Sequence, residues 1–250
     1  MNATPHSTAA NGAYYRNVLS SRPHPLKTLD SIATIVTCDR DHEICRETQP
    51  AEHWYFVIAG VVRRCALRPD GRRQIVGLLL PGDFFGFTAG DHYDYTAEAV
   101  AEGTVLASYP RRRVETFADS DPRLARELRQ ATFEAMSRLQ AQLLILGRIT
   151  ALEKVGSFIL EMEIRLSQGR GDSIALPISR YDIADYLAVS VETVSRSLTD
   201  LKQRGAIKLS GTRTVKIVDR DVLEEGEHDE WTGQPKFRTH GTATPVRAVA

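Results

Sequence analysis

Three polar residues, Glu192, Ser195 and Arg196, are spaced so that they share one face of a helix. An arginine guanidinium fits the O6 and N7 acceptors of guanine, and a carboxylate accepts a hydrogen bond from the N4 amino group of cytosine. A serine hydroxyl beside them can bond to a neighbouring base. A solvent-exposed ion pair between Glu192 and Arg196 would explain the same spacing, so the surrounding elements must decide between the two interpretations.

The residues around these three predict a helix-turn-helix over 179–204. Ser179 is a suitable N-cap with Asp182 three residues later, as in a capping box. Ala188 and Val189 form the turn, and Ser190 caps a second helix that Gly205 follows. The buried positions are Ile183, Ala184 and Leu187 in the first helix, and Val194, Leu198 and Leu201 in the second. Because the first turns of such a second helix enter the major groove, Glu192, Ser195 and Arg196 are predicted to read bases.

The stretch after this motif predicts a β-hairpin, the wing of a winged helix. Residues 206–209 and 214–218 flank Gly211, and Arg213 lies near the tip. Seven basic and two acidic residues occur from Arg196 to Arg220, which gives a local charge of +5 in a chain with 32 basic and 32 acidic residues. One basic module in a neutral chain is typical of a sequence-specific binder of double-stranded DNA. The residues predicted to contact the DNA backbone are Ser179, Arg180, Ser190, Thr193, Lys202 and Arg213.

Short strands separated by turn residues dominate the region from about Ser31 to Pro110. The predicted strands are Ile32–Cys38, Trp54–Ala59, Val61–Leu67, Gln74–Leu80, Thr96–Ala101 and Thr104–Tyr109. Strands at this spacing indicate a rolled antiparallel sheet, and the fold class is α+β.

A long helix is predicted from Pro122 to about Arg148. Leu128, Ala135, Leu139, Leu146 and Ile149, with Thr132 and Gln142 between them, alternate at spacings of four and three, as in a heptad seam. This seam could pack within the subunit. A contact between two copies is the favoured interpretation, since helix-turn-helix proteins present two recognition helices about one DNA turn apart. A second helix over 151–166 and a Gly-rich link at 168–172 follow.

These elements divide the chain into five predicted segments. They are a flexible N-terminal tail over 1–25, a β-roll sensor-like domain over 26–118, a dimerisation helix over 119–149, a winged helix-turn-helix DNA-binding domain over 150–224 and a flexible C-terminal tail over 225–250. No run of 18 apolar residues predicts a membrane span, and the N-terminus lacks a signal pattern. We therefore expect a cytoplasmic protein.

In this order, roll, long helix and winged helix-turn-helix resemble the CRP/FNR superfamily of bacterial transcription regulators. The most specific stretches are Leu-Gly-Arg-Ile-Thr-Ala-Leu-Glu-Lys-Val at 146–155 and Ser-Val-Glu-Thr-Val-Ser-Arg at 190–196. The pattern Glu-x-x-Ser-Arg is that of the FNR/FixK branch, whereas the cyclic-AMP receptor branch has an arginine where this chain has Val191. The resemblance implies a homodimeric activator, not an enzyme, that binds a palindrome of TTGAT-like half-sites and contacts RNA polymerase. It also implies FixK-like control in low-oxygen or nitrogen-fixing conditions.

The sensor residues of that superfamily are replaced in this chain. In cyclic-nucleotide receptors a Gly-Glu pair holds the ribose and an Arg-Ser pair holds the phosphate, but the corresponding stretches here are Gly86-Phe87-Thr88 and Tyr95-Thr96-Ala97. We therefore predict no tight binding of cyclic AMP or cyclic GMP. An FNR-type iron–sulfur cluster needs four thiolates, and the chain has only Cys38, Cys45 and Cys65. The prediction is a regulator without cofactor or metal, with the three thiols buried in strands.

Three alternatives remain open at this point. An unidentified effector could occupy the roll beside Phe84, Phe85, Phe87 and Tyr95, although core packing explains this aromatic cluster better. Haem could be held by His42, His53 or His92. A cupin-type metal enzyme is disfavoured because its ligand set includes two histidines one residue apart, and no His-x-His occurs.

Overall fold

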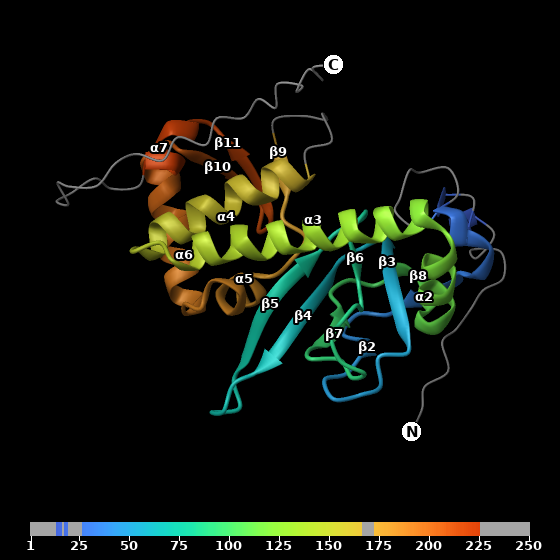
Figure 1. Ribbon diagram of the computed structural model, residues 1–250. Coiled ribbons are helices and arrows are strands. Elements are labelled where there is room, and N and C mark those ends of the chain that lie inside the picture. Colours follow the sequence, from blue (N-terminus) through green and yellow to red (C-terminus); the bar gives the residue numbers. More distant parts are fainter. Residues whose placement is uncertain (1–13, 17, 20–26, 167–172, 226–250) are drawn as a thin grey trace, which may run out of the picture.

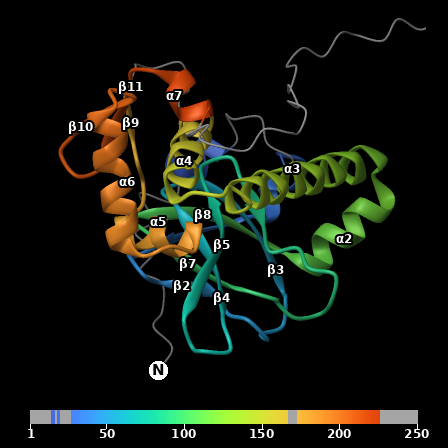
Figure 2. The ribbon, with the colours of Figure 1, turned by 90° about the vertical axis from the view of Figure 1, so that its left-hand side faces the viewer.

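The computed structural model describes residues 14–16, 18–19, 27–166 and 173–225. A roll of antiparallel strands forms one end of the molecule, and helix α3 (Pro122–Leu146) runs along it towards a compact C-terminal module. Figures 1 and 2 show this arrangement from two sides. The predicted fold class is confirmed. Most of the two predicted tails, and the link at 168–172, lie outside the described residues.

Two four-stranded antiparallel sheets make up the roll. Their strand orders are β1-β8-β3-β6 and β2-β7-β4-β5. The strands are β1 (Thr34–Cys38), β2 (Glu43–Cys45), β3 (His53–Ala59), β4 (Val62–Leu67), β5 (Arg73–Leu79), β6 (Phe84–Phe85), β7 (Thr96–Ala99) and β8 (Thr104–Pro110), preceded by the 3₁₀ helix η1 (Lys27–Ile32).

The six predicted strands match β1, β3, β4, β5, β7 and β8 to within two residues at each end. The prediction missed β2 and β6, which are too short to carry an alternating pattern. It also missed helix α2 (Arg111–Ser120) inside the segment predicted as roll, because Val114 is the only fully buried residue of that helix.

Part of the predicted N-terminal tail is ordered against the roll. Residues 14–16 and 18–19 are helical. Leu19 is buried in the same cluster as Leu29 and Phe56. An apolar side chain from this segment therefore packs into the core of the roll, whereas flexibility over 1–25 stays a prediction.

Helix α3 begins at the predicted Pro122, behind an Asp121 N-cap, and ends at Leu146. Helix α4 (Ala151–Leu166) has the predicted bounds. The C-terminal module then contains β9 (Ser173–Ala175), α5 (Arg180–Leu187), α6 (Val191–Gln203), β10 (Ile207–Ser210), β11 (Thr214–Ile217) and α7 (Arg220–Glu225). The strand order β10-β11-β9 adds to the predicted hairpin a third strand that the sequence did not indicate.

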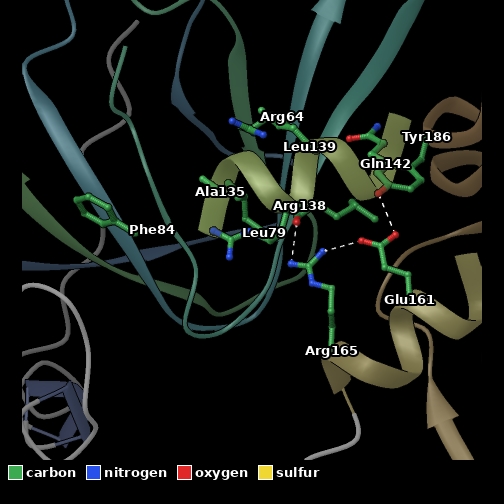
Figure 3. A pocket seen from close by; sticks show the side chains of 12 residues that line it. Arg64, Leu79, Phe84, Ala135, Arg138, Leu139, Gln142, Glu161, Arg165 and Tyr186 are labelled. Atoms are coloured by element: carbon green, nitrogen blue, oxygen red, sulfur yellow. Dashed lines mark hydrogen bonds and ion pairs between the residues drawn. The ribbon is translucent and has the colours of Figure 1, made fainter. Parts of the chain in front are cut away.

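The roll and the C-terminal module share one hydrophobic core. A single cluster joins Cys65 and Ile75 of the roll to Phe158 of α4 and Tyr186 of α5. Figure 3 shows a small pocket at this junction, where Arg165 of α4 reaches Glu161 and Glu161 in turn accepts a hydrogen bond from Tyr186. Within the described ranges, no helix combines the length and apolar character needed to cross a bilayer.

Candidate nucleic-acid interface

Two capped helices build the helix-turn-helix as the sequence predicts. The Ser179 hydroxyl accepts a hydrogen bond from the Asp182 backbone N–H, and the Asp182 carboxylate accepts one from the Ser179 N–H, which completes the capping box. Ala188 ends α5 in the left-handed region at φ 54°. Ser190 then caps α6 by accepting from the Thr193 N–H at 3.1 Å. The turn is therefore fixed at both of its ends.

The buried side of α6 determines which of its residues face outward. Val194, Leu198 and Leu201 are buried against the module, which leaves Glu192 and Arg196 exposed on the opposite face. Hydrogen bonds from its own backbone and from Ser190, together with the charge of Arg196, lower the pKa of Glu192. Among the described residues no direct ion pair joins Glu192 to Arg196, so both charged groups are available to a ligand.

Ser195 lies between the two charged residues and is half-buried. Arg180, at the start of α5, donates from Nη1 to Ser195 Oγ at 3.1 Å. The hydroxyl oxygen thereby accepts one hydrogen bond from the protein and can still donate its proton to an acceptor on a base. Arg180, predicted as a phosphate contact, thus lies against the predicted base-reading face.

The exposed basic residues of the module surround this face. Arg196, Lys202, Lys208 and Arg213 are exposed, and Arg213 follows the wing turn in which Gly211 has φ 68°. Carboxylates of the chain itself pair with Arg204 and Arg220, two residues of this basic stretch. Arg204 pairs with Asp200 at 2.9 Å, and Arg220 pairs with Glu163 at 2.6 Å. The positive charge that this surface offers to a ligand is therefore smaller than the local charge counted from the sequence.

Several residues of the predicted dimer seam on α3 pack within the subunit. Leu128 packs against the core of the roll, and Ala135 is buried in the junction of Figure 3. Gln142, between the seam residues, is also buried and donates to the Ile75 carbonyl at 3.2 Å. These positions face the chain's own roll because α3 lies along it. Leu128 and Ala135 therefore contact their own subunit, and their part in a dimer contact stays a prediction.

A different line of apolar residues on α3 faces solvent. Met136 is 50% exposed, Leu139 41% and Leu143 66%. With the exposed Thr132 and the half-buried Leu146 they keep heptad spacing, and we call these five residues the outer stripe. The outer stripe retains Leu139 and Leu146 from the prediction and replaces Ala135 by its neighbour Met136.

The region that corresponds to a nucleotide site is an open hollow of about 670 Å³ between the roll and α3. Phe87 and Tyr95 line it, and Phe87 also packs on Phe84 with ring centroids 5.7 Å apart. The sequence reasoning missed Arg64, which reaches this hollow from β4 and lies 5.1 Å from the centre of the Tyr95 ring. Neighbouring residues on a strand point to opposite faces of the sheet, so Arg63 and Arg64 must face different sides of the roll. This alternation was the signal that could have revealed Arg64.

The three cysteines are free and buried. Burial is the main cause that raises the pKa of Cys38 and Cys65 to about 11 and that of Cys45 to about 12, from an ordinary 9.0. In the part of the chain that the structure describes, His, Cys, Asp and Glu side chains form no group of three that could hold a metal ion.

These thiols are expected to be slow to react with a disulfide reagent. Because the thiolate is the attacking form, Cys38 and Cys65 should react at about pH 8 roughly 100-fold more slowly in the native protein than in urea, and Cys45 roughly 1000-fold more slowly. The native state keeps the thiols protonated where the unfolded chain would ionise them, so their contribution to stability is lost as pH rises from about 9 to about 11. Absorbance of the released chromophore gives the rates, and rapid reaction of one thiol in the native protein would contradict the burial.

Comparison with known proteins follows the same division of the chain. Residues 153–225 match the Crp-like helix-turn-helix domain, and residues 35–121 match the cyclic nucleotide-binding domain. The nitrogen fixation regulation protein FixK of Azorhizobium caulinodans is 42% identical over 202 residues, which cover 80% of this chain and 81% of that protein. FixK of Rhizobium meliloti is 39% identical over 76% of this chain and 85% of its own length.

A solved structure agrees with these relatives. The structure of FixK2 from Bradyrhizobium japonicum superimposes with a TM-score of 0.73 at 40% identity, over 78% of this chain and 96% of that one. Fold, domain matches and sequence identity point the same way. The chain belongs to the CRP/FNR family of DNA-binding transcription regulators, and FixK proteins are among its close relatives.

Proposed function

We propose that this chain is a homodimeric transcription activator that binds a palindromic DNA site without a cyclic nucleotide or an iron–sulfur cluster. The observation that carries the proposal is the exposed pair Glu192 and Arg196 on α6, held by a helix-turn-helix that is capped at both helices. A helix placed in this way enters the major groove with its first two turns against the bases.

Each of the three predicted base-reading residues has a chemical role in this proposal. Arg196 reads the guanine of a TTGAT-like half-site through O6 and N7, and Glu192 accepts from the amino group of a cytosine. Ser195 donates its hydroxyl proton to a neighbouring acceptor while Arg180 occupies its oxygen. The DNA backbone is contacted by Ser179, Arg180, Ser190, Thr193, Lys202 and Arg213.

The outer stripe supports the dimer. Exposed apolar residues at heptad spacing on a helix of 25 residues are the usual basis of a two-stranded contact between parallel copies. Two copies joined along α3 would present two α6 helices to one DNA duplex. The proposed dimer residues are Leu139 and Leu146 from the sequence prediction, joined by Met136 and Leu143.

The names of the relatives give the biological setting of the proposal. FixK proteins are nitrogen fixation regulators by name, and FnrL of Cereibacter sphaeroides, 33% identical over 72% of this chain, is a transcriptional activator by name. We therefore place this chain in the cytoplasm, as an activator that contacts RNA polymerase at promoters of low-oxygen or nitrogen-fixation genes.

Selection of DNA sequences by the purified full chain, with no added effector, tests the proposal. We expect an inverted repeat with a G·C pair in each half-site, and two subunits per site by light scattering. Enrichment of an asymmetric sequence, or of nothing, would contradict it. Metal analysis of the same sample tests the absence of iron and of other metals, including haem iron.

A second candidate is a regulator gated by a small anionic effector in the roll. Arg64 favours it, since its Nε is buried without a hydrogen-bond partner in the described structure and the side chain borders the open hollow. The two candidates differ in the selection experiment. An effector-gated protein would enrich its site only when a metabolite extract is added.

A further inference from the structure

A cluster of six charged side chains lies between the roll and the first helix of the DNA-binding motif. Arg63 of β4 and Arg73 of β5 face Asp41 and Glu98 of the roll, and Asp182 and Asp185 of α5. We propose that this cluster, which we call the junction clamp, positions the helix-turn-helix on the roll in the arrangement that binds DNA. The inference rests on the proposed function. In it, the residues of the junction clamp do not contact DNA but affect DNA binding by fixing the orientation of α6.

Arg63 is the centre of the junction clamp. Its three nitrogens donate to Glu98 at 2.8 Å, to Asp41 at 2.8 Å and to Asp182 at 2.9 Å. Burial disfavours its charge, but the hydrogen bond and charge of Glu98, with the charge of Asp182, outweigh burial and raise the pKa of Arg63. The guanidinium therefore stays charged while it joins two strands of the roll to α5.

Arg73 makes a second link to the same helix. Its Nη2 lies 2.7 Å from Asp185 Oδ2 and 3.3 Å from Asp182 Oδ1. The next residue, Gln74, donates from its amide to the Asp185 backbone carbonyl. Two adjacent residues of β5 thus hold both the side chain and the backbone of α5.

One carboxylate oxygen of Asp182 makes local contacts, and the other makes contacts with residues distant in the sequence. Oδ2 accepts from the Ser179 backbone and hydroxyl, which caps α5, while Oδ1 accepts from Arg63 and Arg73. The side chain is only 6% exposed. The start of α5 is therefore tied to the roll by the same carboxylate that begins the helix. Since α5 leads into α6 through the fixed turn at Ala188, the roll sets the direction of the recognition helix.

A shared apolar core alone would not fix that direction. The hydrophobic effect holds the two parts together but has little orientational preference. Buried ion pairs contribute little net stability, yet removal of one partner leaves a charge without compensation, so they select the one arrangement that satisfies them. In this arrangement Glu192 and Arg196 are exposed. The junction clamp therefore favours the state in which the recognition face is accessible.

Charge reversal at the exposed edge of the junction clamp tests the inference. Arg73→Glu places a carboxylate against Asp182 and Asp185, and we expect it to weaken binding to the selected site at least tenfold, because the competent arrangement is less populated. The double variant Arg73→Glu/Asp185→Arg restores opposite charges and should recover most of that loss. Arg72→Glu is the matched control. It makes the same change of charge one residue earlier, where the side chain is 76% exposed and pairs with Asp70.

Small-angle scattering of the free proteins adds a measurement that does not depend on DNA. Arg73→Glu should increase the maximum dimension relative to the wild type and to Arg72→Glu, and the double variant should restore it. Circular dichroism checks that each variant is folded. If Arg73→Glu does not fold, the milder variant Asp185→Asn replaces it in the test, with an expected loss of DNA affinity of about threefold.

Unchanged or tighter DNA binding by folded Arg73→Glu would overturn the inference, as would an equal loss in Arg72→Glu or no recovery in the double variant. If the wild type itself selected no palindrome, the proposed function would fail. The scattering comparison would then still decide whether the junction clamp holds the two parts together.

Discussion

Arg196→Ala is expected to lower the affinity for the selected DNA site by about 1–3 kcal/mol, or roughly 5- to 150-fold, and to relax the preference at one G·C pair per half-site. The reason is that a guanidinium fork supplies two hydrogen bonds to guanine, and alanine supplies none. Arg196 is exposed and carries no core contact, so the fold should persist. Fluorescence anisotropy with the selected site and with all single-base variants of each half-site measures both effects.

Lys202→Ala and Arg213→Ala are the controls for this prediction. Each removes an exposed positive charge next to the reading face. If they contact phosphates, they should weaken binding to all sequences alike and reduce the slope of log affinity against log salt by about 1. Base preference that persists in Arg196→Ala would show that another residue reads that pair.

Leu143→Lys is expected to separate the dimer and to reduce affinity for the full palindrome by about 10²–10⁴-fold, since the second half-site is then no longer bound in the same event. Leu143 is 66% exposed in the subunit and lies between Leu139 and Leu146 in the outer stripe. A lysine at this position would place two charges against each other across a two-fold contact. Analytical ultracentrifugation measures the dimer, and titration with full and half palindromes measures the loss.

Ile164→Lys is the matched control for the dimer variant. Ile164 is 71% exposed, on α4 and outside the outer stripe, so the substitution changes charge and apolar area equally. It should remain dimeric and bind as the wild type does. If Leu143→Lys remained dimeric, the subunits would have to meet at another surface. If Ala135→Lys stayed folded but became monomeric, the dimer contact would instead include Ala135, as the sequence predicted.

Local signals predicted the DNA-binding module almost completely. The caps at Ser179 and Ser190, the turn at Ala188 and the glycines after α6 and in the wing all depend on neighbouring residues, and short-range chemistry decides them. The strands of the roll with six or seven residues were equally visible, because turn residues separate them and most of them are largely apolar.

What the sequence could not reveal depends on contacts between distant segments. The heptad pattern on α3 has two apolar lines side by side, and only the position of the roll decides that Ala135 faces inward and Met136 outward. The junction clamp is equally hidden, since Arg63 and Asp182 are 119 residues apart along the chain. Asp182 was visible as a cap, and nothing local indicated its second role.

The core shared by Ile75 of the roll and Tyr186 of α5 has a consequence for protein engineering. A hybrid regulator that joined this roll to the reading module of a relative would create a new boundary through apolar side chains and through the carboxylates that meet β4 and β5. Such a hybrid should take the hairpin of β4 and β5 from the same protein as the DNA-binding module. The reason is that this hairpin belongs to the roll in the sequence but packs against the module in the structure.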